Sequence, residues 1–419
     1  MKAYTTYLLH LLPASVLCLA LLCGCEKDEA PEPTPVERTL LVYICADNNL
    51  AEDAQANVRA MERGFAAQGA GACGTHLVVY LDTPQGHPQL LEVTASGTRE
   101  VYAWPSPHDS ASPEVLREVI RRVCRDYPAA KYGLVLSSHG MAWVPSTATA
   151  YFTRSRSRAG EQWPATKYFG QDDHPGPTGY LETEELAAAI PDGHFDYILF
   201  DACFMASAEV MYALRAKADY IVAAPTEVIS EGFPYAEIVG ELLAPQPDLE
   251  SVCRTYYEHY ARHPDARYHS ASVSLICTSE LEALCDVRTR LWSSALARDP
   301  GIFADFDLSQ VQRLDRYRRP FLFDLNSVVK RLETLGAVTG ADAAQWRAQL
   351  ARTVVYEAHT PVFFDLAIAE CSGLSGYVPV AAYPDLNACY KTLEWCQHNQ
   401  DVTLSGFTPP LPDNRVITQ

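Results

Sequence analysis

From residue 38 onward, short apolar runs alternate with longer segments in which apolar residues recur at helical spacing. Thr39–Ala46 is apolar at nearly every position, the pattern of a strand that is covered on both faces. Leu50–Arg63 follows with apolar residues three and four apart, which predicts a helix. This alternation continues to about residue 245 and predicts an α/β fold, with an open, mostly parallel sheet flanked by helices.

The same reading places the other elements along the chain. Further strands are expected at Thr75–Asp82, Leu90–Val93, Arg99–Ala103, Tyr132–Ser138, Tyr197–Phe200, Tyr220–Ala224, Ala271–Thr278, Pro361–Ala369 and Gly373–Pro379. Further helices are expected from Ser112-Pro113 and from Thr183, and at Met205–Lys217, Leu249–Arg262, Ser279–Ala297 (capped by Ser279), much of 300–350, and Leu386–His398. The changed texture beyond residue 245 predicts a core at 39–245 and a C-terminal α+β extension at 246–419 packed on it.

Two of the expected strands end in reactive side chains. Leu134-Val-Leu-Ser-Ser runs into His139-Gly140, and Ile198-Leu-Phe runs into Asp201-Ala-Cys203. Sites in open α/β sheets lie outside the carboxyl ends of strands, so we expect the imidazole and the thiol to meet there. A free thiol has a pKa of about 8.5 and needs a neighbouring base to become a nucleophile at neutral pH. The pattern predicts a Cys–His pair of a cysteine peptidase.

The residues beside the pair fit that chemistry, although each has a simpler interpretation. The N–H groups of Gly140 and Cys203 are candidates for the oxyanion hole. Asp201, two residues before Cys203, shares its face of an extended segment and suits the floor of a pocket for a cation. Taken singly, His139 is more often structural, Cys203 an inert core thiol and Asp201 a helix N-cap. Their joint occurrence at two strand ends favours catalysis.

At these residues the chain resembles the clostripain-like cysteine peptidases, relatives of gingipains, legumains and caspases. The resemblance spans roughly residues 39 to 390 and rests on the two strand ends together with Leu40–Leu50, Thr183–Leu186, Met205–Val210, Ala224–Val228, Glu231–Tyr235, Phe323–Leu325 and Gly373–Pro379. It implies a caspase-like sheet, with His139 as base, Cys203 as nucleophile and Asp201 at the base of an S1 pocket for Arg or Lys. The family's Glu-Glu run reads Thr226-Glu227 here, which leaves the fine specificity open.

The expected function is therefore endopeptidase cleavage by a Cys–His dyad, since no third catalytic residue is evident from the sequence. Glu227 and Glu231 follow the next strand and are candidates for the same substrate-binding cleft; a solvated surface position is the simpler interpretation of both. The alternative is a catalytically silent surface lipoprotein that binds peptides or glycans. A nucleotide-binding protein has no support, because no glycine-rich phosphate loop follows a strand.

Residues 141–180 carry few periodic apolar positions and many Ser, Thr, Gly and Pro residues. A solvated surface loop is the simplest interpretation of such a stretch. The resemblance implies a sharper one, since members of the family cleave themselves between the His and the Cys. The candidates for self-cleavage after a basic residue are Arg154, Arg156, Arg158 and Lys167.

The first residues predict export and lipidation. An apolar run from Tyr7 to Cys23 reads as a signal peptide over 1–24. Leu22-Cys-Gly-Cys25 resembles a bacterial lipobox, with Cys25 as the lipidated residue; a signal peptide with a later cut is the alternative. The charged, proline-rich stretch 25–38 reads as a tether, and Lys27-Asp-Glu29 resembles the surface-export signal of Bacteroidetes lipoproteins. We expect an outer-membrane lipoprotein on the periplasmic face or the cell surface.

The charge and the cysteine content of the chain indicate which classes of partner and cofactor to expect. The formal net charge of −19 argues against nucleic acid, whose phosphates need clustered Lys and Arg. The chain has 13 cysteines, most of them in apolar runs and none in a CxxC pair, so buried thiols are expected and a zinc site is not. No metal or other cofactor is expected; some relatives use calcium, but no EF-hand pattern is present. The expected partners are protein or peptide substrates, the membrane only through the N-terminal lipid, and no second subunit.

Overall fold

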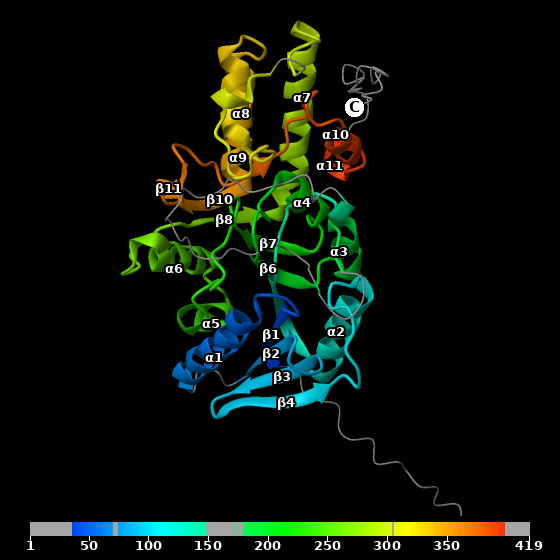
Figure 1. The fold of residues 1–419 in the computed structure, drawn as a ribbon, viewed down its shortest axis with the longest axis vertical. Helices are drawn as coiled ribbons and strands as arrows, with labels where there is room; N and C mark the ends of the chain where they lie inside the picture. The colour runs from blue at the N-terminus through cyan, green and yellow to red at the C-terminus, as the bar shows by residue number, and fades with distance from the viewer. Residues whose placement is uncertain (1–35, 70–73, 148–171, 173–178, 304–305, 399–419) are drawn as a thin grey trace, which may run out of the picture. The chain divides into compact units, whose positions relative to one another are not determined.

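A nine-stranded sheet runs through the computed structural model, which describes residues 36–69, 74–147, 172, 179–303 and 306–398. The described residues belong to one compact unit. The strand order of the sheet is β10-β8-β7-β6-β5-β1-β2-β3-β4 (Figure 1). The strands of this sheet are β1 (Val36–Cys45), β2 (Thr75–Asp82), β3 (Gln89–Thr94), β4 (Gly97–Ala103), β5 (Ala129–Ser137), β6 (Phe195–Asp201), β7 (Ala218–Ala223), β8 (Ser272–Cys277) and β10 (Val354–His359). The predicted α/β sheet is confirmed.

The centre of the sheet is parallel and its two margins are antiparallel. β1 pairs in parallel with β2 on one side and β5 on the other, and β5, β6 and β7 continue in parallel. β3 and β4 at one margin, and β8 and β10 at the other, pair antiparallel. The chain leaves β1 for β2 and returns to β1's other side with β5, so the strand order reverses at β1. Such a reversal opens a crevice at the carboxyl ends of the strands, where ligands bind.

Helices cover both faces of the sheet (Figure 1). The helices are α1 (Ala51–Ala67), α2 (Pro113–Asp126), α3 (Thr183–Ala189), α4 (Ala208–Ala213), α5 (Tyr235–Leu243), α6 (Leu249–Ala261), α7 (Leu281–Arg298), α8 (Leu325–Thr334), α9 (Gly340–Thr353), α10 (Pro384–Tyr390) and α11 (Glu394–Gln397). Buried residues of α1, α5 and α6 share one core with Tyr197 and Leu199 of β6, whereas those of α2, α3, α4 and α7 share the other with Ile198 and Phe200. None of the helices in the described ranges combines the length and the apolar character that a membrane crossing requires.

Several predicted boundaries are wrong. The helix expected at Met205–Lys217 is shorter, because α4 begins only after Ser207, whose side chain caps it by accepting from the N–H of Val210. A 3₁₀ turn over Thr278–Glu280 precedes α7, so Ser279 is not its cap.

The C-terminal half also departs from the predictions. Pro361–Ala369 is not one strand: Phe364 has a φ of 52° and separates the short strands β11 (Val362–Phe363) and β12 (Leu366–Ala367). The expected strand at Gly373–Pro379 shortens to β13 (Ser375–Gly376), which pairs with β9 (Phe323–Asp324). Helix α5 and the edge strand β10 were not predicted. The predicted boundary at residue 245 stays a prediction, since the sheet continues across it into β8 and β10.

Nine cysteines lie in the described residues and all are free thiols. Most of them were predicted to be buried, but only four of the nine are; the other five are half-buried. The buried ones are Cys45, Cys203, Cys253 and Cys285. One of these, Cys203, lies at the carboxyl edge of the sheet.

Candidate active site

His139 and Cys203 come from neighbouring parallel strands. Ser137 of β5 pairs in register with Asp201 of β6, and the two candidate residues each lie two positions further on. Both side chains are buried, with 1% and 0% of their surfaces exposed. A Cβ added at Gly140 would lie 2.1 Å from the carbonyl oxygen of Cys203. The two turns therefore touch through their backbones, and only glycine at position 140 permits that approach.

The backbone around Cys203 is held on both sides. The N–H of Val228, beyond β7, donates a hydrogen bond to Sγ of Cys203 at 3.0 Å. The next residue, Phe204, has a φ of 64°, although it is not glycine, and its N–H donates to the carbonyl of Thr226 at 2.8 Å. A side-chain-bearing residue in this region costs about 1–3 kcal/mol and is typical of functional sites, where packing enforces it. This turn fixes the position of the Cys203 thiol and buries the ring of Phe204.

His139 has a partner that sequence reasoning missed. Its Nε2 lies 2.7 Å from Oδ1 of Asn49, in the loop after β1. With an amide oxygen as acceptor, Nε2 carries the proton and Nδ1 keeps the lone pair that a base needs. Ser138 ties the two loops together by donating from Oγ to the carbonyl of Cys45 at 2.8 Å. The sequence offered one signal for this partner: the polar run Asp47-Asn-Asn49 comes directly after the buried strand β1, as His139 and Cys203 come after β5 and β6.

Replacing Asn49 with alanine is expected to lower kcat about tenfold to hundredfold, because the imidazole loses the acceptor that orients it. Asn49→Asp is expected to move the acid limb of the pH profile of kcat upward, since a carboxylate stabilises the imidazolium. Steady-state kinetics from pH 5 to 9 measures both effects. Gln55→Ala in α1 is the control, and an unchanged profile in both Asn49 variants contradicts the positioning role.

Asp201 is completely buried at the end of β6. Its Oδ2 accepts hydrogen bonds from the hydroxyls of Ser137 at 3.2 Å and Tyr235 at 3.0 Å. Tyr235 begins α5, so the carboxylate lies on the sheet face that α1, α5 and α6 cover. Burial, and then the charge of Asp201, raise the pKa of the Tyr235 phenol. The protein thus encloses this carboxyl group two residues before Cys203 in the sequence.

The two other acidic candidates have different surroundings. Glu227 is buried and pairs with Arg316, whose Nε lies 2.6 Å from Oε2, and Arg316 also pairs with Asp365 at 3.1 Å. Its charge is therefore compensated by the chain itself. Glu231 is exposed, where water screens a charge. Substrate binding by these residues stays a prediction.

Some predicted functional positions lie outside the described residues. They are the lipidation candidate Cys25 and the self-cleavage candidates Arg154, Arg156, Arg158 and Lys167.

Three carboxylates gather beside the crevice, where β1 and β2 end. Oxygens of Asp47, Asp82 and Asp172 lie within 4.8 Å of one another. Ser110 holds two of them, since its Oγ donates to Asp82 and its N–H donates to Asp172 at 2.5 Å. Oxygen ligands of this kind suit Ca²⁺ or Mg²⁺. Burial raises the pKa of the Asp82 carboxyl to about 7, so this group holds a proton at mildly acidic pH.

The titration of Asp82 has a consequence for stability. Between about pH 4 and pH 7 the folded chain retains a proton that the unfolded chain has lost, so the free energy of unfolding falls as pH rises through this window. Asp82→Asn is expected to weaken that fall, and Asp219→Asn, at an exposed position, to leave it unchanged. Urea denaturation at several pH values measures it, with Cys203→Ala present in every protein to prevent proteolysis. Equal pH dependence with and without Asp82 contradicts the assignment.

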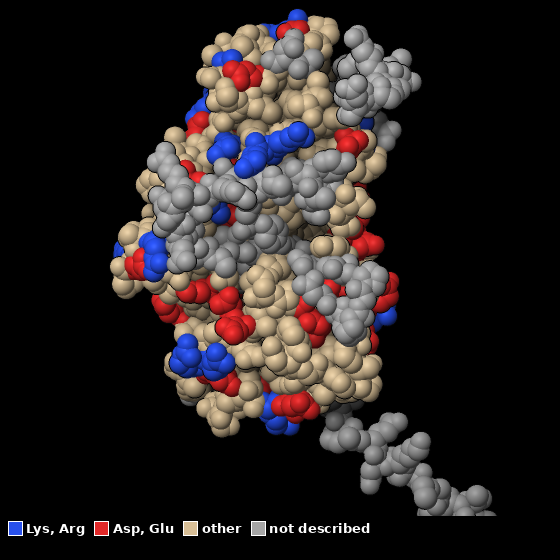
Figure 2. Space-filling view, viewed as in Figure 1, with Lys and Arg blue, Asp and Glu red and all other residues tan. Residues whose placement is uncertain are grey.

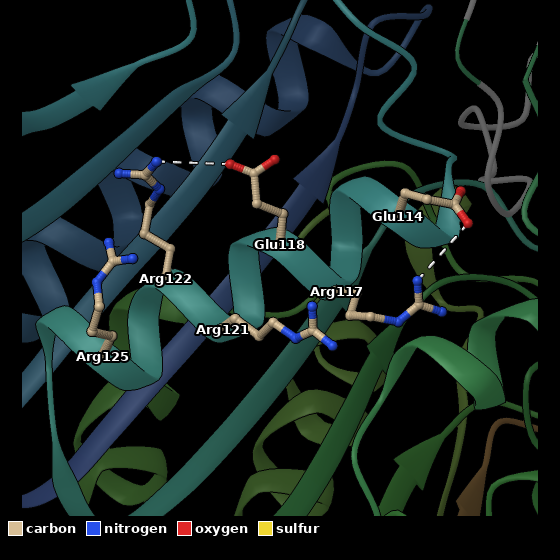
Figure 3. A pocket seen from close by; sticks show the side chains of 6 residues that line it. All are labelled: Glu114, Arg117, Glu118, Arg121, Arg122 and Arg125. Carbon is tan, nitrogen blue, oxygen red and sulfur yellow. Dashed lines mark ion pairs between the residues drawn. The ribbon is translucent and has the colours of Figure 1, made fainter.

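A separate hollow of about 360 Å³ lies along the outer face of α2. Figure 3 shows its lining of four arginines and two glutamates, projecting from successive turns. Arg117 pairs with Glu114 and Arg122 with Glu118, one helical turn apart. Such pairs stabilise an exposed helix by a few tenths of a kcal/mol each. All six lining residues belong to α2, so we interpret these charges as stabilising that helix.

Acidic residues outnumber basic ones in the chain, which has a formal net charge of −19. On the face drawn in Figure 2, they gather over α1 and the neighbouring sheet ends.

Comparison with known proteins agrees with this geometry. The model of the clostripain family matches residues 42–363. The chain is similar to an inactive zymogen C11 protease from Parabacteroides distasonis, with 31% identity over 87% of this chain and 98% of that one and a TM-score of 0.72. It is also similar in fold to a secreted C11 cysteine protease from Bacteroides thetaiotaomicron solved with an irreversible peptide inhibitor, with 24% identity, 86% and 98% coverage and a TM-score of 0.68. A search of curated proteins found no match.

Proposed function

Because this chain belongs to the clostripain family and is a cysteine-type endopeptidase, we propose that Cys203 is its nucleophile and His139 its base. The observation that carries this assignment is the contact between the two strand ends, where Gly140 packs on the backbone of Cys203. Thiol and imidazole lie in the turns that follow two adjacent strands, an arrangement that suits a nucleophile and its base.

The chemistry follows from that placement. Nδ1 of His139 takes the thiol proton, and the hydrogen bond from Val228 N–H favours the anionic sulfur. The thiolate attacks the scissile carbonyl, and the oxyanion is stabilised by the N–H groups of Gly140 and Cys203. The imidazolium then protonates the leaving amine, and water hydrolyses the thioester to restore the thiol. Asn49 accepts from Nε2 in both the neutral and the protonated ring, which keeps the imidazole oriented and, when it is neutral, leaves Nδ1 as the base.

We assign the P1 preference to Arg and Lys. The support is the buried carboxylate of Asp201, which lies two residues before Cys203 and accepts hydrogen bonds from the hydroxyls of Ser137 and Tyr235, whereas Glu227 is engaged by Arg316. A basic P1 side chain would supply the charge that complements Asp201.

An irreversible peptidyl probe tests the nucleophile and the specificity together. We expect an acyloxymethyl ketone with lysine or arginine at P1 to label Cys203, and the same probe with leucine at P1 to label it far more slowly. Peptide mass spectrometry locates the adduct, and Cys277→Ala serves as the control for a half-buried thiol. Labelling that misses Cys203 and spreads over other cysteines would favour a silent binding protein.

The burial of both reactive side chains supports a second step. With 1% and 0% exposure, His139 and Cys203 cannot receive a peptide until the surrounding chain rearranges. We propose that cleavage between residues 141 and 180 provides this rearrangement. Mass spectrometry of the products from purified 26–419 protein is expected to show a new end after Arg154, Arg156, Arg158 or Lys167. Activity that appears while the chain stays intact contradicts self-processing as the activating step.

We also propose that the enzyme is a lipoprotein anchored through Cys25 to the outer membrane. The support is the lipobox-like sequence and the proline-rich stretch after it. An alkyne-tagged fatty acid is expected to label the wild-type protein in cells and not Cys25→Ala. We further propose that protein or peptide substrates are the only macromolecular partners of the enzyme. We also propose that the enzyme is a monomer and that its catalysis needs no cofactor.

A further inference from the structure

Outside the catalytic crevice, three side chains with different metal-binding atoms meet at the edge of the sheet. Glu357 and His359 lie two residues apart on β10 and so share one face of that strand. Cys371 comes from the segment after β12. The carboxylate oxygen, the imidazole nitrogen and the sulfur all lie within 4.8 Å of one another. Each of these residues is half-buried, and Glu357 borders a surface hollow beside the cluster.

The segment that carries Cys371 is fixed in place from both sides. Ser372 donates from its N–H at 2.5 Å and its Oγ at 2.7 Å to Oδ2 of Asp324, which also caps α8. Gly373 has a φ of 85°, and a Cβ there would lie 2.6 Å from Cγ1 of Val354. The chain is thus pressed against β10 just beyond Cys371, and the thiol is presented to Glu357 and His359 by the fold.

The space beside the cluster is suited to an exchangeable ligand. A hollow of about 270 Å³ is bordered by Glu357, Ser372 and Asn326. Oδ1 of Asn326 is buried and has no hydrogen-bond partner among the described residues. An unsatisfied buried oxygen costs about 1–3 kcal/mol, so a polar species in the hollow would stabilise the site.

We propose that Glu357, His359 and Cys371 form a zinc site, with three protein ligands and a fourth position occupied by water. Thiolate, imidazole and carboxylate are the ligand types of Zn²⁺, whereas Ca²⁺ and Mg²⁺ prefer oxygen alone. Tetrahedral bonds of about 2.0–2.3 Å place ligand atoms roughly 3.3–3.8 Å apart, so closing the cluster requires shifts of about one ångström. The buried carboxylate of Asp324 nearby adds negative charge that favours a cation.

Binding balances as an exchange of protons for the metal. His359 Nδ1 and Glu357 share a hydrogen bond in the metal-free chain. Zn²⁺ replaces the proton on Nδ1, and the neutral ring then carries its one proton on Nε2; the Cys371 thiol releases its proton to solvent, as does the ring when it starts as an imidazolium. Bonds form from zinc to sulfur, to Nδ1 and to a carboxylate oxygen, with no change of oxidation state.

The site is distinct from the catalytic pair. β8 and β7 separate β10 from β6, which places the cluster about 14 Å from the strand that carries Cys203. Zinc there would join the edge strand to the segment after β12. Its expected effect is therefore a higher melting temperature of the folded chain, without any contact to the reacting atoms.

Metal titration of the 26–419 protein carrying Cys203→Ala tests the proposal, because that change removes the catalytic thiol as a competing ligand. We expect one equivalent of Zn²⁺ by competition with a chromophoric chelator, and a higher melting temperature. Co²⁺ is expected to produce a near-ultraviolet thiolate charge-transfer band. Cys371→Ser and His359→Gln are each expected to weaken zinc binding about 100-fold or more, and Cys371→Ser to abolish the cobalt band.

Two matched variants distinguish this cluster from other groups. Cys277→Ser changes another half-buried thiol, and Asp82→Asn changes the carboxylate cluster near β2; both are expected to retain zinc binding and the cobalt band. Circular dichroism verifies folding, and His359→Gln serves if Cys371→Ser does not fold. Binding that survives both cluster changes, or a cobalt spectrum without a thiolate band, overturns the assignment.

Discussion

Replacing Cys203 with alanine is expected to reduce peptide hydrolysis by about 10⁵-fold or more, while the chain still folds. Loss of a nucleophile that works as a unit with its base removes nearly all of the chemical rate enhancement. The side chain is small; its Sγ accepts a hydrogen bond from Val228 N–H at 3.0 Å and donates one to the Val228 carbonyl at 3.6 Å. Leaving that buried donor without an acceptor costs about 1–3 kcal/mol of stability, which a chain with two extensive cores should tolerate.

Fluorogenic peptides that differ only at P1 measure this effect on purified 26–419 protein. Circular dichroism and urea denaturation establish that the variant is folded. Cys277→Ala is the matched control and is expected to keep full activity, because this thiol lies at the end of β8, away from the crevice. Hydrolysis by a clean Cys203→Ala preparation above about 1% of the wild-type rate contradicts Cys203 as the nucleophile.

Asp201→Asn is expected to lower kcat/KM for Arg and Lys substrates by about 10²–10³-fold and to change that for neutral P1 residues much less. Removing one partner of a buried, hydrogen-bonded charge pair costs about 2–5 kcal/mol, and 1.4 kcal/mol corresponds to a tenfold change. The amide oxygen of asparagine can still accept from Ser137 and Tyr235, so the local structure should survive. The loss therefore reports on the charge alone.

Three other variants separate the candidate acids. Glu227→Gln is expected to affect specificity less, because Arg316 already compensates that carboxylate. Glu231→Gln is expected to have a small effect, since its side chain is exposed. Tyr235→Phe removes a hydrogen bond to Asp201 without removing its charge. If Asp201→Asn keeps the preference for basic P1 residues and Glu227→Gln loses it, the floor of the pocket is Glu227.

The catalytic pair could be predicted because its signals are local. A buried parallel strand is apolar at every position, so its end is visible in the sequence, and the carboxyl ends of parallel strands meet at one edge. His139 and Cys203 each follow such an end within two residues. The order of strands and helices in the first half was predictable for the same reason.

Contacts between distant segments were decided by the tertiary structure. In the sequence Asn49 looks like any other loop residue. Its amide contacts His139, 90 positions away, because β1 pairs with β5 in the folded chain. Glu227 looked like a free carboxylate because its partner Arg316 lies 89 residues away on the C-terminal half. Sequence patterns record which face of an element is apolar, but they carry no information on which charges meet across the fold.

The edge strand β10 was not predicted from the sequence. β10 is an edge strand in which five residues are half-buried and one is exposed, so it lacks the continuous buried apolar run that identified the central strands. Its pairing with β8 bridges some 80 positions, and the packing of the segment after β12 against it brings Cys371 to Glu357 and His359. The sequence by itself determined the buried strands and the reactive residues at their ends, because burial leaves a local apolar pattern. The partners that orient, neutralise or join those residues were decided only by the folded chain, because long-range pairing brings together side chains that have no common local pattern.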